Sequence, residues 1–331
     1  SLVGSEMCIR DSHSIDHNLL KLDILGHLDP TMIRMLQDLT GIDPLEIPLD
    51  SREVMSLFKD TSALGITPED IGGCKLGALG IPEFGTDFAM QMLMDTKPQY
   101  FSDLVRIAGL AHGTDVWLGN AQTLIKEGKA TISTAICTRD DIMIYLIQKG
   151  LDSEESFKIM EMVRKGKVAS GKCKEWPEWK QDMIDHGVPD WYIWSCERIK
   201  YMFPKAHAAA YVMMAWRVAY CKVFYPLAYY TAYFSIRATA FDYEKMAMSP
   251  VRLEHYIAEY KAKKAEGTIS NTEEDELGVM RIVQEMHARG YEFTPIDIYK
   301  AKARTFQIID GKIMPSFKVI SKVGEVAGES I

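Results

Sequence analysis

One stretch, Lys200–Pro226 (KYMFPKAHAAAYVMMAWRVAYCKVFYP), constrains the fold of this chain more than any other part of the sequence. Proline fixes its own φ and moves the preceding residue out of the helical region, so Phe203-Pro204 is predicted to end one helix and open another. His207 and Tyr211 follow at a spacing of four residues, which places them on one face of the new helix. We therefore expect a long helix around which the rest of the chain is organised.

The start of this helix has two interpretations. Lys205 and His207 lie in its first turn, where backbone N–H groups have no partner within the helix. Together with the positive end of the helix dipole they would form an anion site suited to phosphates, and the neighbouring alanines would let a ligand approach closely. Taken alone, the pattern favours the other interpretation, a buried alanine-rich core helix from which Lys205 reaches solvent.

Composition sets wide limits. The chain has 331 residues, of which 47% are hydrophobic and 25% charged, which suits an ordinary globular protein of two or three subdomains. The six cysteines are scattered without a C-x-x-C pair, so we predict no zinc ribbon or disulfide framework and expect reduced thiols in a cytoplasm. The sequence has no apolar run long enough to predict a transmembrane helix. A net charge of −8 argues against a general nucleic-acid coat protein, so nucleic-acid binding would require locally clustered Lys and Arg.

Local patterns predict mostly helices. Asp29 is expected to cap a helix with Pro30 at its first position that ends at Gly41, and Asp50 or Ser51 is expected to cap a short second one. A long loop rich in glycine and proline follows over 64–86, and two further helices are predicted at about 250–265 and 272–289. Other predicted N-caps are Thr86, Ser102, Thr114 and Thr138.

Two short β elements are also predicted. Leu20, Leu22 and Ile24 alternate with residues that include Asp23, which indicates a short strand with Asp23 on the face opposite the apolar side chains. Asp310-Gly311 separates two apolar runs and predicts a tight hairpin. By itself, a single strand aspartate such as Asp23 is usually a surface residue or a cap.

Several long stretches, in order along the chain, resemble the α subunit of bacterial DNA polymerase III, of the PolC type found in Gram-positive bacteria. They are NLLKLDILGH (18–27), LGIPEFGT (79–86), HGTDVWLGNAQ (112–122), TRDDIMIYL (138–146), FKIMEMVRKGK (157–167) and PKAHAAAYVMMAWRVAYCKVFYP (204–226). The resemblance covers about residues 13–320. It implies a mainly α fold, the fingers of a polymerase, with one palm-type β-strand near the N-terminus and a small β-hairpin near the C-terminus.

The resemblance also implies a division of the chain. Residues 1–12 do not join the pattern and are expected to be a non-native leader, and 13–28 to be an edge strand of the palm. Residues 29–240 correspond to the fingers, and 241–314 to a helical linker region with the hairpin. Residues 315–331 resemble the start of a helix-hairpin-helix that grips duplex phosphates, with Val323 and Gly324 at its hairpin and its second helix missing.

The resemblance to this family also implies roles for individual residues in the matched stretches. Triphosphate contacts are expected from the basic residues of the matched stretches, and stacking near the nascent base pair from two tyrosines. The basic residues are Arg139, Arg164, Lys165, Lys205 and His207, and the tyrosines are Tyr201 and Tyr211. Each also has an ordinary interpretation, because basic helix ends usually match the dipole, and aromatic residues on a helix usually belong to a core.

Polymerases of this kind join a primer hydroxyl to a nucleotide α-phosphate with two Mg²⁺ ions held by aspartates. The resemblance makes Asp23 the third of three catalytic and metal-binding aspartates, while the Asp-x-Asp pair of the palm has no counterpart in this chain. We therefore expect a fragment that binds dNTPs and primer–template DNA in the cytoplasm and does not polymerise alone. Contacts with the sliding clamp and other replisome subunits are expected outside it.

A second hypothesis belongs to a different class, a non-catalytic helical module that binds DNA or a protein partner. The acidic net charge, the missing Asp-x-Asp pair and the incomplete hairpin motif support it. A small-molecule enzyme has no support, because the sequence has no G-x-G-x-x-G, P-loop, H-E-x-x-H or nucleophile elbow.

Overall fold

The helix predicted after Pro204 is present in the computed structural model, which describes residues 26–321 and 323. Helix α12 (Lys205–Phe224) begins directly after Pro204, and Pro226 opens the next helix, α13 (Pro226–Ala232). The preceding helix, α11, already ends at Cys196, so the expectation that Phe203-Pro204 ends a helix was wrong. A non-helical segment, residues 197–204, which starts with a turn, lies between the two helices instead.

The described part of the chain is mainly helical, with fourteen α-helices and one two-stranded antiparallel sheet. Besides α12 and α13, the helices are α3 (Asp29–Thr40), α4 (Arg52–Ser56), α5 (Asp87–Thr96), α6 (Phe101–His112), α7 (Gln122–Lys126), α8 (Arg139–Gln148), α9 (Ser153–Arg164), α10 (Trp176–Asp185), α11 (Asp190–Cys196), α14 (Tyr243–Met246), α15 (Pro250–Glu266) and α16 (Asn271–Ala288). The strands are β1 (Gln307–Ile309) and β2 (Lys312–Met314). Short single turns, among them η5 (Tyr233–Arg237), connect these elements.

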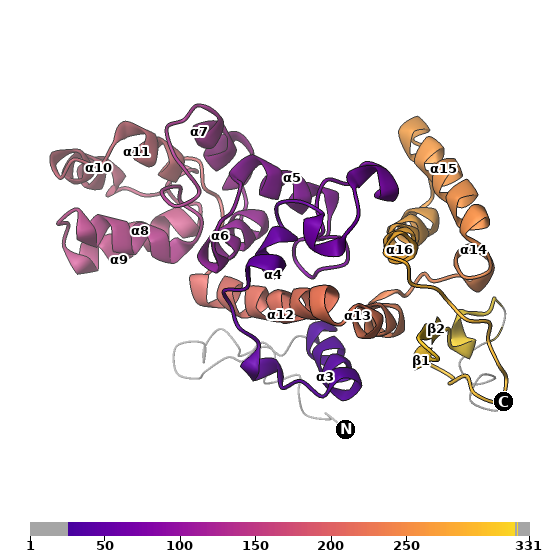
Figure 1. The fold of residues 1–331 in the computed structure, drawn as a ribbon. Coiled ribbons are helices and arrows are strands. Elements are labelled where there is room, and N and C mark those ends of the chain that lie inside the picture. The colour runs from indigo at the N-terminus through magenta and orange to yellow at the C-terminus, as the bar shows by residue number, and fades with distance from the viewer. Residues whose placement is uncertain (1–25, 322, 324–331) are drawn as a thin grey trace, which may run out of the picture.

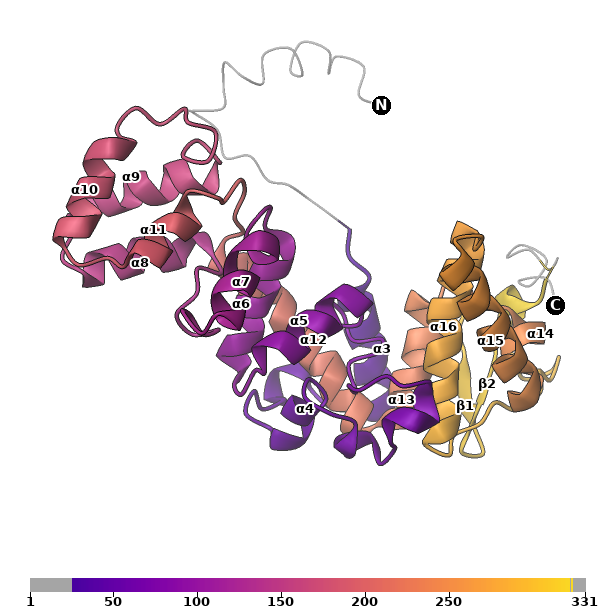
Figure 2. The ribbon, with the colours of Figure 1, turned by 90° about the horizontal axis from the view of Figure 1, so that it is seen from above.

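The helices form three groups along an elongated molecule (Figures 1 and 2). Helices α8–α11 lie at one end, and α14–α16 with the hairpin lie at the other. Helix α12 runs through the middle, where it packs against α3, α4, α6 and α13. Its small and large apolar side chains are buried on several sides, as expected for a central helix: Ala208, Val212, Ala215, Trp216, Val218 and Ala219.

The structure confirms helix starts at three of the predicted N-cap positions. Ser51, Thr86 and Thr138 occupy N-cap positions, and Ser51 and Thr86 accept backbone N–H groups there. The predicted caps Ser102 and Thr114 were wrong. Helix α6 begins at Phe101, one residue before Ser102, and Thr114 forms an isolated antiparallel bridge with Tyr201.

The predicted cap Asp29 was also wrong. Asp29 is the first residue of α3, after Leu28 at the cap position, and its buried carboxylate forms an ion pair with Arg237 of η5 instead. The helix ends before Gly41, whose φ of 75° is the left-handed conformation typical of a glycine C-cap.

The predicted hairpin is confirmed. Asp310 and Gly311 have φ values of 50° and 75°, the conformation that a tight two-residue turn requires, and Ile308 pairs with Ile313 across the ladder. The hairpin packs against α13. The predicted strand around Asp23 lies outside the described residues, as do Gly324 and most of the predicted helix-hairpin-helix, of which Val323 is described.

One buried ion pair links the central helix to the C-terminal group of helices. Lys222 of α12 and Glu285 of α16 are both inaccessible to solvent, with 2.8 Å between Nζ and Oε1. Lys222 also donates to the carbonyl oxygens of Gly77 at 2.8 Å and Leu79 at 2.6 Å. Its three ammonium protons therefore have three acceptors, and the Tyr230 hydroxyl donates to Glu285 at 2.6 Å.

Candidate functional site

Four helix ends, those of α6, α8, α9 and α12, meet at the segment 197–204. Thr114, just after α6, exchanges backbone hydrogen bonds with Lys200 and Tyr201, and the Met202 N–H donates to the carbonyl of Arg164 at the end of α9. At the start of α8, the Arg139 N–H donates to the carbonyl of Phe203 at 3.1 Å. Residues that are far apart in the sequence therefore border one segment that leads directly into α12.

A row of rings lies along this segment and the first turns of α12. Phe203 contacts His112 at 5.2 Å, His207 at 4.7 Å and Tyr201 at 6.3 Å between ring centroids. His207 contacts Tyr211 at 4.5 Å, so the predicted shared face of these two residues is confirmed. The row ends at His27, whose Nε2 lies 2.6 Å from the Tyr211 hydroxyl. His207 and Tyr201 are exposed, so part of the row faces solvent instead of a core.

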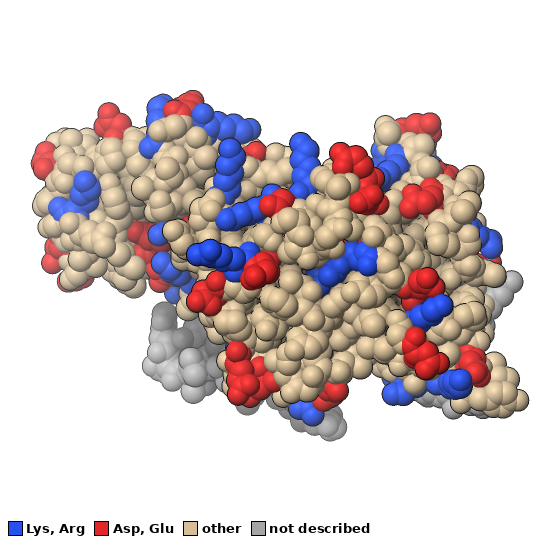
Figure 3. All heavy atoms as spheres, viewed as in Figure 1, with Lys and Arg blue, Asp and Glu red and all other residues tan. Residues whose placement is uncertain are grey.

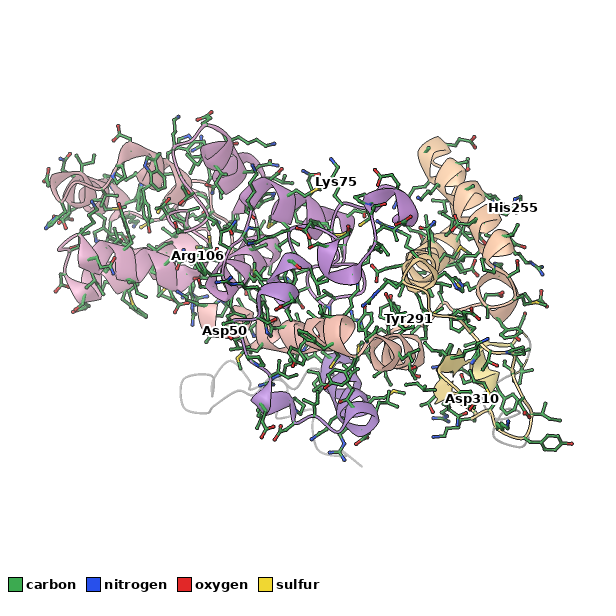
Figure 4. All side chains as sticks on the ribbon, in the orientation of Figure 1. Asp50, Lys75, Arg106, His255, Tyr291 and Asp310 are labelled. Atoms are coloured by element: carbon green, nitrogen blue, oxygen red, sulfur yellow. The ribbon has the colours of Figure 1, made fainter. Side chains whose placement is uncertain are left out.

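The start of α12 is only partly open to an anion. The backbone N–H of Lys205 donates to Asp140 Oδ2 at 2.7 Å, so a carboxylate from α8 already occupies one of the donors expected to be unpaired. The Lys205 ammonium lies 3.8 Å from Asp141. Asp141 also faces Arg106 of α6 at 3.8 Å, at the junction of α6 and α8 where Arg106 is labelled in Figure 4.

Arg164 and Lys165 also have a close carboxylate, and Arg139 is partly buried. Arg164 donates to Glu161 through Nε and through a terminal nitrogen at 2.9 Å, and Lys165 lies 2.9 Å from the same carboxylate. These hydrogen bonds, that of Arg164 first, lower the pKa of Glu161 to about 2. Nε of Arg139 is buried and has no hydrogen-bond partner in the part of the chain that the structure describes.

Charges of both signs are interspersed over the molecular surface shown in Figure 3, and no broad basic face appears there. The −8 net charge therefore does not separate into an acidic face and a basic face in this view. Local pairs such as Glu161 with Arg164 show the same mixing at short range. An anion on this face would meet separate cations instead of a wide positive field.

Two residues of the ring row, His27 and His112, were not singled out by the sequence patterns. His112, at the C-terminal end of α6, hydrogen bonds to Glu83, whose backbone is in the left-handed region with a φ of 70°. This hydrogen bond is the main cause that raises the pKa of His112 above its usual 6.5. Burial, and then the nearby charge of His112, lower the pKa of His207. The available signal was position in the matched stretches, because His112 opens HGTDVWLGNAQ and His27 ends NLLKLDILGH.

The His112–Glu83 pair predicts a pH dependence of stability. Because the folded-state pKa of His112 lies above 6.5, its contribution is complete below pH 6.5 and is lost as the pH rises through the raised value. We expect His112→Gln to remove this part of the pH dependence. Thermal unfolding of both proteins between about pH 5 and pH 9 measures it, since an unperturbed histidine titrates near 6.5. Parallel curves for the two proteins would contradict the prediction.

The described residues hold no group of three or more His, Cys, Asp and Glu side chains arranged to bind a metal ion. Near the ring row, the carboxylates of Asp140 and Glu161 are engaged by N–H donors and cations. These carboxylates do not fit a Mg²⁺ site, which needs oxygen ligands that are free to bind the ion. The predicted metal ligand Asp23 lies outside the described residues.

No helix in the described part of the chain is long and apolar enough to cross a lipid bilayer. The longest, α12, is 20 residues and carries Lys205, Arg217 and Lys222.

The helices that precede the segment 197–204 match a known protein domain. Residues 29–187 match the family described as bacterial DNA polymerase III alpha subunit finger domain. The match covers α3 to α10, together with three of the helix ends that border the segment 197–204, those of α6, α8 and α9.

Whole-chain comparison identifies the type. The chain is 53% identical over 321 residues to DNA polymerase III PolC-type of Bacillus subtilis, and this match covers 97% of the chain and 22% of that protein. It is 53% identical over 319 residues to the PolC-type enzyme of Streptococcus suis, and 50% identical over 321 residues to that of Caldanaerobacter subterraneus. The chain belongs to the PolC-type DNA polymerase III family and spans about a fifth of the length of these relatives.

Proposed function

We propose that this chain is the fingers module of a replicative DNA polymerase and binds the incoming dNTP and the template. The observation that carries the proposal is the meeting of the ring row with Arg139, Arg164 and Lys205 around the segment 197–204. The relatives named above are DNA polymerases of the same type, which supports this assignment.

The chemistry of a nucleoside triphosphate fits this neighbourhood. Its phosphates carry a charge near −4 and accept charge-assisted hydrogen bonds, which are the strong ones. Lys205, Lys165 and His207 keep exposed or half-exposed side chains that can reach a ligand. Exposed rings such as Tyr201 offer a stacking surface for a base, which is sequence-tolerant because every base has a π face.

The rest of the assignment extends to the whole enzyme. In it, residues 13–28 contribute a palm strand with Asp23 as a Mg²⁺ ligand, 29–240 form the fingers, 241–314 link them to the duplex-binding region, and 315–331 begin a helix-hairpin-helix. The partners are primer–template DNA, dNTPs and, through other regions, the sliding clamp and replisome subunits in the cytoplasm. Asp23 would hold Mg²⁺ in the whole enzyme, where the metal would supply Lewis-acid stabilisation of the attacking and leaving oxygens.

Lys205→Ala tests the nucleotide role in the full-length polymerase that contains this segment. We expect the apparent KM for dNTP to rise about tenfold, the value of one charge-assisted hydrogen bond, while the affinity for primer–template changes little. Single-nucleotide incorporation kinetics and a DNA-binding titration measure the two quantities.

Lys200→Ala is the matched control, because Lys200 lies in the same segment but pairs with Asp115 at 2.7 Å. It is expected to leave both quantities close to wild type. Equal losses of dNTP and DNA affinity in Lys205→Ala would indicate a structural role at the start of α12. If Lys205→Ala changed neither quantity, the proposed phosphate contact of Lys205 would be wrong.

A further inference from the structure

Glu161 is placed where it controls two of the proposed phosphate contacts. Its carboxylate accepts hydrogen bonds from the Arg164 guanidinium and lies 2.9 Å from the Lys165 ammonium. The side chain of Glu161 is 19% exposed and that of Arg164 is 23% exposed, so water screens this contact less than a fully exposed pair.

The position of this cluster is set by backbone contacts to the segment 197–204. The carbonyl of Arg164 accepts the Met202 N–H at 3.3 Å. Gly166 packs so closely on this segment that a Cβ there would lie 2.6 Å from the carbonyl oxygen of Lys200. The end of α9 therefore cannot move away from the ring row without breaking these contacts, and the cations stay beside the proposed nucleotide site.

A carboxylate and a phosphate compete for the same donors. The Arg164 guanidinium has five N–H groups in a fixed plane, and two of its nitrogens already donate to Glu161. A phosphate can use this edge of the guanidinium only after Glu161 leaves it. Glu161 is ionised at neutral pH, because its hydrogen bonds to Arg164 and Lys165 hold its pKa at about 2.

We propose that Glu161 is an intramolecular competitor for phosphate, which holds Arg164 and Lys165 neutralised until a polyphosphate displaces it. This inference rests on the proposed nucleotide function of these two cations. It makes the two cations selective for polyphosphates. A single phosphate displaces the carboxylate poorly, whereas a chain of linked phosphates carries more charge and displaces it well. Glu161 acts through Arg164 and Lys165 and is a positioning residue.

The test uses the 331-residue chain with inorganic tripolyphosphate as the probe, titrated by calorimetry at low ionic strength. Glu161→Gln keeps the size of the side chain and removes its charge. It is expected to lower the Kd for tripolyphosphate about threefold to fivefold, the range set by the energies of partly exposed ion pairs. Arg164→Ala is expected to raise it. The gain in Glu161→Gln is expected to shrink in about 0.5 M salt, because screening weakens the competing pair.

Glu154→Gln is the matched control. Glu154 lies on the same helix and pairs with Lys158 at 2.7 Å in the same i,i+4 arrangement, so it changes the net charge equally without touching Arg164. It is expected to leave the Kd unchanged. Glu161→Asp, whose shorter side chain bridges both cations less well, is expected to fall between wild type and Glu161→Gln and checks the result if Glu161→Gln unfolds.

The outcomes separate the inference from the function on which it rests. If Arg164→Ala weakens binding but Glu161→Gln does not strengthen it, the competitor role is overturned and the phosphate contact stands. An equal gain in Glu154→Gln also overturns it, because net charge alone would then explain the effect. If no variant binds tripolyphosphate, the nucleotide role of these cations fails together with the inference.

Discussion

Replacing Lys222 by methionine is expected to lower the free energy of unfolding by about 3–5 kcal/mol, the usual loss when one partner of a buried ion pair is removed. The substitution keeps most of the length of the side chain but leaves the Glu285 carboxylate inside the protein without its cation. It also removes the donor to the Gly77 and Leu79 carbonyls. Burial already lowers the pKa of Lys222, and the Glu285 carboxylate opposes this shift.

Chemical denaturation of the 331-residue chain measures this loss through the transition midpoint and slope. The double variant Lys222→Met/Glu285→Gln removes the uncompensated charge and is expected to recover part of the stability. Lys264→Met is the control, since Lys264 pairs with Glu274 at an exposed site, and its effect should stay within about 0.5 kcal/mol. A loss in Lys222→Met no larger than the control would mean that the buried pair contributes little.

Asp23→Asn in the full-length polymerase is expected to slow nucleotide incorporation about 1,000-fold or more, since several kcal/mol of transition-state stabilisation depend on the metal ions and each 1.4 kcal/mol is a factor of ten. Asparagine has nearly the same shape as aspartate, but its neutral amide is a much poorer Mg²⁺ ligand than a carboxylate. The affinity for primer–template DNA is expected to change little. Rapid-quench kinetics and a DNA-binding titration measure the two quantities.

Asp29→Asn is the matched control for this substitution. Asp29 is an aspartate in the same part of the sequence, but the structure places its carboxylate against Arg237. It is expected to reduce stability and to leave the incorporation rate near wild type. If Asp23→Asn also polymerised normally, Asp23 would be an ordinary surface residue or cap, and the non-catalytic module would become the better hypothesis.

Sequence patterns identified the elements that local chemistry controls. Pro204 precedes α12, Gly41 follows α3 as its C-cap, and Asp310-Gly311 forms the hairpin turn. These features depend on the φ of proline and on the left-handed conformation, which act within a few residues. The resemblance to PolC-type polymerases was also correct, since long ordered stretches are specific.

Predictions failed where a side chain had a better partner far away in the sequence. Asp29 was expected to cap its own helix but pairs with Arg237, and Thr114 was expected to start a helix but bridges to Tyr201. No local pattern contains these partners. A short polar side chain can satisfy either a nearby N–H group or a distant one, and only the packed structure shows which it does.

The candidate site also combines features that follow from local sequence with contacts that only packing decides. By itself, the sequence determined that Lys205, His207 and Tyr211 lie together, because they share the first turns of one helix. Only the tertiary structure showed that Asp140, from a helix far back in the chain, caps α12 and that Lys222 pairs with Glu285 inside the protein. Helix position follows from backbone geometry over a few residues, whereas the partner of a charge depends on how distant helices pack, since Coulomb energy depends on distance in space and not on separation along the chain.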